Sequence, residues 1–350
     1  MSKRFLIIDG SSMLSTSYYG NLPKSIVFAK SDEDKMKHYD EILQTSDGRY
    51  TNAMYVMVRS MFRLLRFVRP DYFAVAFDMS RNTFRRTELG ADFYKANRSE
   101  TASPLKSQFV QMEDFLEQIG VRVLYGPNYE ADDYIASIVS KFEHEDDLQI
   151  IVHSKDHDFM QLVAENVELW RPMRQSNIDD MLLKHWITKD SVVFNNLVVY
   201  TSDVVKFDTG VYPSQIVDLL SLEGDVGDGI PGCKGVSSAA APLVSYYGSV
   251  NALYDAIYSC DGDKKKEKEL VDLWKTQLGI KRSPLNALKN NRDMVFLSKN
   301  LVQMKRDIVQ IPQDLQDYEF SICLPALMSL LQNYEMKSLY SYCETIVESF

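Results

Sequence analysis

The chain has 350 residues, of which 45% are hydrophobic and 25% charged, and its formal net charge is −10. This composition is ordinary for a globular protein, and the length suffices for one large domain or two. No apolar run reaches the roughly 18 residues that a membrane-spanning helix needs. No signal-peptide pattern follows Lys3, and the four scattered cysteines predict free thiols, so we expect a cytoplasmic protein. The acidic charge argues against a nucleic-acid partner unless the acids gather in a cation-binding pocket.

Four apolar runs predict β-strands, at residues 5–8, 72–77, 121–125 and 148–152. Helical patterns separate these strands, and the longest has apolar residues at core spacing over 54–68. Strands joined by helical crossovers are typical of a mostly parallel α/β sheet flanked by helices, which is the fold class we expect.

Two segments near these elements stand out by composition. Residues 24–50 are polar and charged, which predicts a surface excursion. On the helix that follows, Arg59, Arg63 and Arg66 share one face, which is either solvated or in contact with phosphate. Residues 80–106 interleave basic and aromatic side chains, a pattern suited to gripping phosphates and unpaired bases.

The second half of the chain is mainly helical in pattern. Residues 174–198 are irregular and predict an insertion. A helix expected over 213–222 runs into a glycine-rich stretch, 223–235, whose tight turns let backbone N–H groups approach a phosphate closely.

Carboxylates recur where the predicted strands end. Asp9, Asp78, Glu130 and Asp156 follow the four strands in turn. The carboxyl ends of the strands form the ligand-binding edge of an open α/β sheet, so we expect these side chains to meet there. An acidic first turn of a helix would explain the acids near Glu130 alone, but not the repetition. With the acids of the glycine-rich stretch, the predicted set is Asp9, Asp78, Glu130, Asp132, Asp133, Asp156, Asp158, Asp225 and Asp228.

Such a crowd of carboxylates requires bound cations or strongly raised pKa values. Oxygen ligands without cysteine favour Mg²⁺ or Mn²⁺ over zinc. Two ions about 4 Å apart would direct the attack of water on a phosphodiester. His157 lies between two of the predicted ligands, and we expect it to point away and to be structural.

These motifs resemble those of the 5′ nucleases, the family that includes the 5′→3′ exonuclease domain of bacterial DNA polymerase I, the phage 5′ nucleases and the flap endonucleases. The resemblance covers roughly residues 4–255 and includes all of the expected carboxylates. The matching motifs are Asp9-Gly10-Ser11-Ser12, Ala76-Phe77-Asp78 with Thr83-Phe84-Arg85, Tyr94-Lys95-Ala96-Asn97-Arg98, Glu130-Ala131-Asp132-Asp133, Asp156-His157-Asp158 and Gly224-Asp225-Val226-Gly227-Asp228-Gly229-Ile230-Pro231-Gly232.

The resemblance implies a PIN-like sheet, a helical arch at about 80–106 that admits a single-stranded 5′ end, and a helix–turn–helix clamp on duplex DNA. The expected organisation is an α/β nuclease core over 1–173, the insertion over 174–198, a helical clamp region over 199–260 that completes the metal site, and a C-terminal helical extension over 261–350.

The resemblance also implies a division of the carboxylates between two ions. One ion would be surrounded by Asp78, Glu130, Asp132 and Asp156. The second would be served by Asp158, Asp225 and Asp228, and Asp9 and Asp133 would hold metal-bound water.

For the DNA, the resemblance implies that Lys95 stabilises charge on the scissile phosphate. An arch arginine, either Arg85 or Arg86, would assist, and Tyr94 would stack on a terminal base. The remaining expected DNA contacts are Arg98, Gly232, Lys234 and Gly235.

One departure concerns the clamp. After Gly235 the family usually has a second glycine and a Lys-Thr pair, whereas this chain has Ser237-Ser238-Ala239-Ala240. The departure weakens the expectation of a strong duplex clamp and of a K⁺ ion there.

The implied enzyme is a stand-alone, phage-like, monomeric 5′ nuclease, because the chain is too short to include a polymerase. Its expected substrates are DNA with a 5′ flap, a nick or a single-stranded 5′ end, and RNA–DNA hybrids at primers, in replication and repair. It would act in the cytoplasm, that of the host if a phage encodes it, without a membrane partner.

Three alternatives compete with this hypothesis. A catalytically inactive junction-binding protein would be expected to lack some of the carboxylates, and none is missing. A small-molecule phosphatase would need a second aspartate two residues after Asp9, where the chain has Ser11. A PIN-type ribonuclease shares the sheet and the acidic pocket, but it lacks the arch and the glycine-rich clamp.

Overall fold

The computed structural model describes residues 2–347, leaving out the side chains of Asn195 and of residues 344–347. The chain divides into two compact units. Unit 1 comprises residues 2–79, 99–155 and 306–347, and unit 2 comprises residues 80–98 and 156–305. The expected boundaries differ from this division, because the C-terminal segment belongs to the same unit as the first strand.

Unit 1 contains a parallel sheet of four strands. They are β1 (Lys3–Asp9), β2 (Tyr72–Ala76), β3 (Arg122–Leu124) and β4 (Leu148–His153), in the order β3-β2-β1-β4. Every residue of β2 is buried. Helices cover both faces of such a sheet, which explains why the strand has almost only apolar side chains. All four strands overlap the predicted ones, which confirms the α/β fold class.

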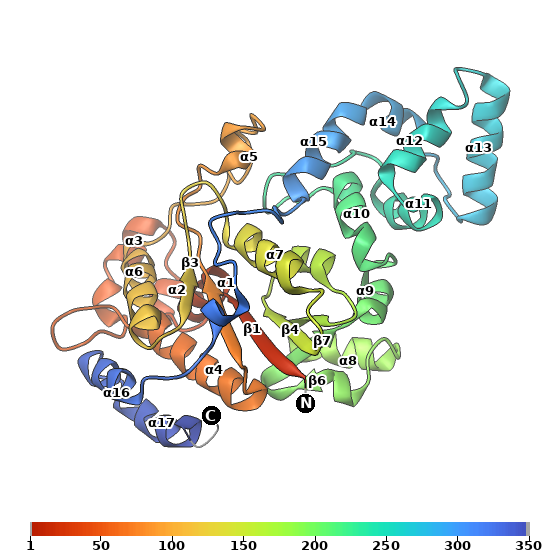
Figure 1. The fold of residues 1–350 in the computed structure, drawn as a ribbon. Helices are drawn as coiled ribbons and strands as arrows, with labels where there is room; N and C mark the ends of the chain where they lie inside the picture. The colour runs from red at the N-terminus through yellow and green to blue at the C-terminus, as the bar shows by residue number, and fades with distance from the viewer. Residues whose placement is uncertain (1, 348–350) are drawn as a thin grey trace. The chain divides into compact units, whose positions relative to one another are not determined.

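Helices pack around this sheet, as Figure 1 shows: α1 (Gly10–Tyr19) lies against α4 (Asn52–Val68), and α7 (Ala131–Phe142) lies on β1 and β2. The C-terminal helices also belong here, with α16 (Leu324–Asn333) against α6 (Ser103–Gln118) and α17 (Tyr340–Val347) against α4.

The segment that leads into these C-terminal helices is part of the core of unit 1. Its Tyr318 ring lies 5.1 Å from the ring of Phe5 and 5.7 Å from that of Phe142, measured between centroids. Residues 306–347 therefore complete the hydrophobic core around the first strand.

The polar excursion contains only short helices, α2 (Lys24–Val27), α3 (Asp32–Met36) and the 3₁₀ helix η1 (Tyr39–Glu41). The arginine face of α4 has a partner that the sequence did not reveal. Arg63 and Arg59 donate hydrogen bonds to the hydroxyl of Tyr342 on α17, and these bonds lower the pKa of Tyr342. Part of the face therefore anchors the C-terminal helix.

Unit 2 contains an antiparallel set of strands, β5 (Val167–Pro172), β7 (Leu197–Tyr200) and β6 (Val192–Val193), with β7 in the middle. The region 174–198, predicted to be irregular, contains helix α8 (Gln175–Leu183) as well as β6. The prediction missed these elements because their apolar positions are too few to show a period.

The rest of unit 2 is helical, as predicted for the second half. Helix α10 (Ile216–Glu223) packs against α15 (Arg292–Val302) and α11 (Ala240–Tyr247). The other helices are α9 (Ser202–Thr209), α12 (Val250–Tyr258), α13 (Lys264–Gln277) and α14 (Leu285–Asn290).

The expected arch at 80–106 is less helical than predicted. It contains one four-residue helix, α5 (Phe84–Thr87), followed by turns until α6 begins at Ser103. The predicted extension 261–350 is divided, since α13 to α15 lie in unit 2 and α16 and α17 in unit 1; residues 348–350 lie outside the described residues. Within residues 2–347, no helix has the length and apolar character needed to cross a bilayer.

Candidate active site

The strand register brings the carboxyl ends of the four parallel strands of unit 1 to one edge. Asp9 lies beside Ala76, Ala76 lies beside Leu124, and Ile8 lies beside His153. Because each strand ends at the same level, the side chains that follow the strands leave the sheet at this edge. The sequence-based expectation for the unit 1 carboxylates is therefore supported by the backbone.

Asp9 is held in place by two donors. It caps the N-terminus of α1, where one carboxylate oxygen accepts the amide of Ser12 at 2.9 Å. The other oxygen accepts the hydroxyl of Ser154, which follows β4, at 2.7 Å. Asp9 is 6% exposed, so its carboxylate is oriented by the fold and shielded from bulk water.

Asp78, two residues after β2, forms hydrogen bonds with α1 and with the start of α7. Its amide donates to the hydroxyl of Ser11 on α1 at 2.7 Å, and its Oδ1 accepts the amide of Ala131, the first residue of α7, at 2.9 Å. The structure thus brings Asp78 to the helix start that carries Glu130 and Asp132.

The acids at the start of α7 have distinct environments. Glu130 and Asp133 form a capping box, in which Asp133 Oδ2 accepts the amide of Glu130 at 3.1 Å. Asp132 is half-exposed, and its Oδ1 accepts the amide of Asp133 at 2.7 Å. The simple explanation of an acidic helix start therefore accounts for Asp133, whose side chain is fully buried.

In unit 2, a cluster follows β4 directly. One ligand atom from each of Asp156, His157 and Asp158 lies within 4.8 Å of the others, close enough to hold a metal ion. The prediction that His157 points away was wrong, because its ring nitrogens lie 3.8 Å from Asp156 Oδ1 and 3.4 Å from Asp158 Oδ1. A tight turn, in which the amide of Asp158 donates to Asp156 Oδ1 at 3.0 Å, folds the ring back toward the carboxylates.

Asp158 has the environment of a cation ligand. Burial raises the pKa of Asp158 well above the usual carboxyl range, the charges of Asp156, Asp225 and Asp228 raise it further, and the Lys95 ammonium opposes the rise. Its Oδ1 is buried and accepts no hydrogen bond. A buried carboxylate oxygen among like charges is stabilised by a bound cation, so these residues fit a divalent ion.

Asp225 and Asp228 share one closed turn. Asp225 and Ile230 exchange two backbone hydrogen bonds, at 2.9 and 2.7 Å, and Asp225 Oδ1 accepts the amide of Gly227 at 2.7 Å. Lys95 Nζ lies 3.4 Å from Asp228 Oδ2, and Arg98 forms an ion pair with Asp228 Oδ1. The structure therefore brings Lys95, Arg98, Asp158, Asp225 and Asp228 together within unit 2.

The environment of the two arch arginines differs. Arg85 is 1% exposed, donates from Nε to the carbonyl of Leu301 at 2.8 Å and packs on Phe84, so it holds the fold together. Arg86 is half-exposed and donates to the carbonyl of Asp92 at 2.6 Å. Arg98, which the sequence assigned only to DNA contact, is the arginine that reaches the acidic cluster.

The expected stacking role of Tyr94 does not match its surroundings. Tyr94 is 2% exposed, and the Lys95 ammonium lies 5.0 Å from its ring centroid and the Arg85 guanidinium 5.7 Å from it. Its ring therefore offers no open face to a base. The neighbouring Phe93 is 39% exposed.

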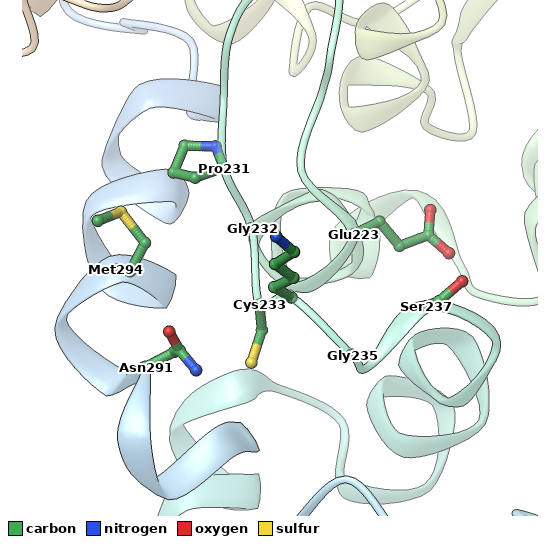
Figure 2. A pocket seen from close by; sticks show the side chains of 9 residues that line it. Glu223, Pro231, Gly232, Cys233, Gly235, Ser237, Asn291 and Met294 are labelled. Atoms are coloured by element: carbon green, nitrogen blue, oxygen red, sulfur yellow. The ribbon is translucent and has the colours of Figure 1, made fainter.

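The glycine-rich stretch lines a pocket of about 780 Å³, with Lys234, Gly235 and Ser237 on one side and α15 on the other. Figure 2 shows Asn291, which precedes α15, and Met294 of α15 on one side of the segment that carries Gly232, and the Glu223 carboxylate directed toward Ser237 on the other side. Gly232 has φ +60°, and a Cβ there would lie 2.4 Å from the amide nitrogen of Gly224, so only glycine fits this turn. Burial raises the pKa of Glu223 above the ordinary carboxyl value.

Comparison with known proteins shows the family to which the chain belongs. Family models of the 5′-3′ exonuclease match residues 4–193 as its N-terminal resolvase-like domain and residues 211–323 as its C-terminal SAM fold. A 5′-3′ exonuclease of Aquifex aeolicus (strain VF5) is 30% identical over 339 residues, covering 97% of this chain and 100% of the relative. The DNA polymerase I of Bacillus caldotenax is 29% identical over 308 residues, covering 88% of this chain and 28% of the polymerase.

Among solved structures, the flap endonuclease D15 of bacteriophage T5, in a complex with DNA and metal ions, has a TM-score of 0.56. It is 17% identical and 99% of each chain is covered, which shows a shared fold. The chain belongs to the 5′-3′ exonuclease family, and it is a nuclease.

The family matches also correct the extent of the resemblance. They include residues 174–193, which belong to the predicted insertion, and they continue to residue 323 rather than ending near 255. The relatives named above are a 5′-3′ exonuclease and a DNA polymerase, which lends no support to a phosphatase or a PIN-type ribonuclease.

Proposed function

We propose that this family member is a divalent-metal-dependent, structure-specific 5′ nuclease. It hydrolyses phosphodiesters near the 5′ ends of DNA flaps and nicks, and of RNA primers, during replication and repair. The observation that supports this most directly is the buried Asp158 carboxyl, whose pKa is raised by burial and by the charges of Asp156, Asp225 and Asp228, as expected of a group that a bound cation would stabilise.

The proposed cofactor is Mg²⁺ or Mn²⁺, two ions per chain, because carboxylate oxygens are the donors these ions prefer. Bound in such a site, the ions supply Lewis-acid stabilisation of the phosphate and lower the pKa of the attacking water. The proposed ligands are Asp78, Glu130, Asp132 and Asp156 for one ion, and Asp158, Asp225 and Asp228 for the other. Asp9 and Asp133 support them, Asp9 from its fixed position at the sheet edge and Asp133 by capping α7 beside Glu130.

The chain supplies the positive charge for the substrate phosphate. In the proposal, the Lys95 ammonium binds the scissile phosphate and stabilises the charge that develops on it. Arg98 assists from the same turn, and its ion pair with Asp228 supports this role. Phe93 stacks on a terminal base, in place of Tyr94.

The duplex part of the substrate is proposed to bind at the glycine-rich turn. The backbone amide of Gly235 and the Lys234 ammonium would contact phosphates there. The expected contact of Gly232 does not match the structure, because Gly232 is buried and its amide donates to the Ser298 hydroxyl at 3.1 Å. A K⁺ ion beside Ser237 belongs to the same proposal, supported by the Glu223 carboxylate that faces this residue. The proposed working state is a monomer in the cytoplasm, of the host cell if a phage encodes the chain.

The test uses a DNA duplex with a 5′ flap, labelled at the flap or at the other end, in Mg²⁺ or in EDTA. We expect cleavage at the junction that requires the metal. In Asp158→Asn the rate should fall by roughly a hundredfold or more, because a negatively charged metal ligand is lost. Asp293→Asn is the matched control, because the Asp293 side chain is fully exposed on α15, and it should cleave normally.

Two outcomes would overturn the proposal. Cleavage of plain single-stranded RNA with no preference for the flap would indicate a PIN-type ribonuclease. Tight flap binding without cleavage in either Mg²⁺ or Mn²⁺ would indicate an inactive junction-binding protein.

A further inference from the structure

Two loops of unit 2 that are far apart in sequence are in contact through their backbones. The amide of Lys95 donates to the carbonyl of Asp228 at 2.8 Å. One residue further along, the backbone of Gly229 approaches the carbonyl oxygen of Phe93 so closely that a Cβ on Gly229 would lie only 2.9 Å from that oxygen. The arch residues 93–95 are therefore docked directly on the turn that carries two proposed metal ligands.

Both sides of this contact have unusual backbone conformations. Lys95 has φ +52°, a left-handed conformation that is unfavourable for a residue with a side chain. Gly229 has φ +74°, which glycine adopts freely. The hydrogen bond to Asp228 and the absence of a side chain at position 229 together stabilise the conformation that turns Lys95 toward the acidic cluster.

The turn that receives the arch is itself fixed. Paired backbone hydrogen bonds between Asp225 and Ile230 close it, and the side chain of Asp225 accepts the amide of Gly227. Arg98, three residues after Lys95, pairs with Oδ1 of Asp228, whereas the Lys95 ammonium lies near Oδ2 of the same carboxylate. A shift of the arch against this turn would move both cations away from the carboxylates.

We propose that Gly229 is a positioning residue for the reaction: by lacking a side chain, it lets the arch segment 93–95 dock on the Asp225–Ile230 turn and so sets the position of the Lys95 ammonium. The catalytic consequence rests on the proposed function of Lys95, whereas the docking itself does not. A displacement of about 1 Å in a catalytic group can cost roughly a hundredfold in rate.

The first experiment measures docking without metal or DNA, by amide hydrogen exchange in the free protein. In Gly229→Ala we expect faster exchange of the amides in 93–98, because the new Cβ must push the Phe93 carbonyl away. Gly248→Ala is the matched control: it imposes the same kind of strain, at φ +81°, with no atom within 4 Å of the new Cβ. Equal exchange in 93–98 for the two variants would overturn the proposal.

A second variant guards against misfolding of Gly229→Ala. Asparagine tolerates a positive φ better than alanine, so Gly229→Asn causes less backbone strain. Its Cβ still collides with the carbonyl oxygen of Phe93. It should be about as stable as Gly248→Ala and still lose protection in 93–98. Protection equal to that of the wild type in Gly229→Asn would contradict the proposed contact.

The second experiment measures cleavage of the 5′-flap duplex. Gly229→Ala should lower kcat roughly ten- to a hundredfold with little change in the Kd for the flap duplex. Lys95→Ala should cost much less in the Gly229→Ala background than in the wild type, because both changes act through the same ammonium group. Independent, multiplicative effects of the two substitutions would overturn the positioning role even if docking were confirmed, and a wild type that does not cleave would refute the proposed function alone.

Discussion

His153, the last residue of β4, is a buried side chain that makes the stability of the protein depend on pH. It is 7% exposed, and burial lowers the pKa of His153 to about 4 from its ordinary value of 6.5. Its Nδ1 is buried without a hydrogen-bond partner. The folded protein therefore holds this ring neutral beside Ser154, the residue that orients Asp9.

This environment predicts a loss of stability in acid. Between pH 6.5 and 4 the unfolded chain binds a proton at His153 that the folded chain does not, so stability rises with pH across this window. The contribution is fully present above about pH 6.5 and is lost as the pH falls toward 4, by about 3 kcal/mol at most. Urea unfolding of His153→Gln in EDTA should show a weaker decline over this range than the wild type. Parallel pH profiles for the two proteins would contradict the prediction.

At the scale of elements, helix α7 joins the sheet to the acidic site through its first turn. Glu130 and Asp133 satisfy each other's backbone amides, and Asp78 satisfies the amide of Ala131. The backbone amides at the start of this helix, which have no partner within the helix, thus donate to carboxylates, and these hydrogen bonds fix the positions of the carboxylates. Capping and ligand placement are the same set of contacts here.

The capping role of Asp133 can be separated from any role in metal binding. Asp133→Ala should lower the free energy of unfolding by about 1–2 kcal/mol in EDTA, because a buried cap is lost. Asp146→Ala, a change at an exposed carboxylate beyond the end of α7, should cost less than about 0.5 kcal/mol. Urea unfolding measures both, and an unchanged stability for Asp133→Ala would show that the cap contributes nothing.

At the scale of the molecule, the C-terminal helices complete unit 1 rather than extend unit 2. Arg49, from the polar excursion, donates to the carbonyl of Asn333 at 2.9 Å, and its guanidinium lies 4.9 Å from the ring centroid of Tyr334. Leu327 of α16 is fully buried. The two ends of the chain therefore stabilise one core together.

This division predicts which probe reports a core mutation. All three tryptophans, Trp170, Trp186 and Trp274, belong to unit 2, so their fluorescence follows that unit. Leu327→Ala should cost about 2–4 kcal/mol in unit 1. It should lower the urea midpoint measured by far-UV circular dichroism more than the midpoint measured by fluorescence. Leu183→Ala, at a leucine that is 79% exposed, is the control and should change neither. Identical shifts in both signals would show that the units unfold together.

The sequence by itself determined the parallel sheet of unit 1 and the carboxylates at its edge. Strands buried on both faces are visible in the sequence as short apolar runs, and each of four such runs is followed by a carboxylate: Asp9, Asp78, Glu130 and Asp156. The topology of a parallel sheet brings the ends of its strands to one edge whatever the details of packing, so the meeting of these carboxylates could be predicted. The glycine-rich turn was visible for a similar reason, since a backbone conformation such as that of Gly232 restricts the residue type.

Tertiary structure alone decided the environment of individual side chains. Arg85 and Arg86 are neighbours of one residue type, yet only packing makes Arg85 a buried structural group. Burial likewise covers the ring of Tyr94. The turn at 156–158 brings the His157 ring to 3.4 Å from Asp158 Oδ1, although the side chain stays 47% exposed. The docking of Lys95 on Asp228 joins positions more than a hundred residues apart, and a local pattern carries no information about such a contact, because it depends on how close two main chains come in the folded state.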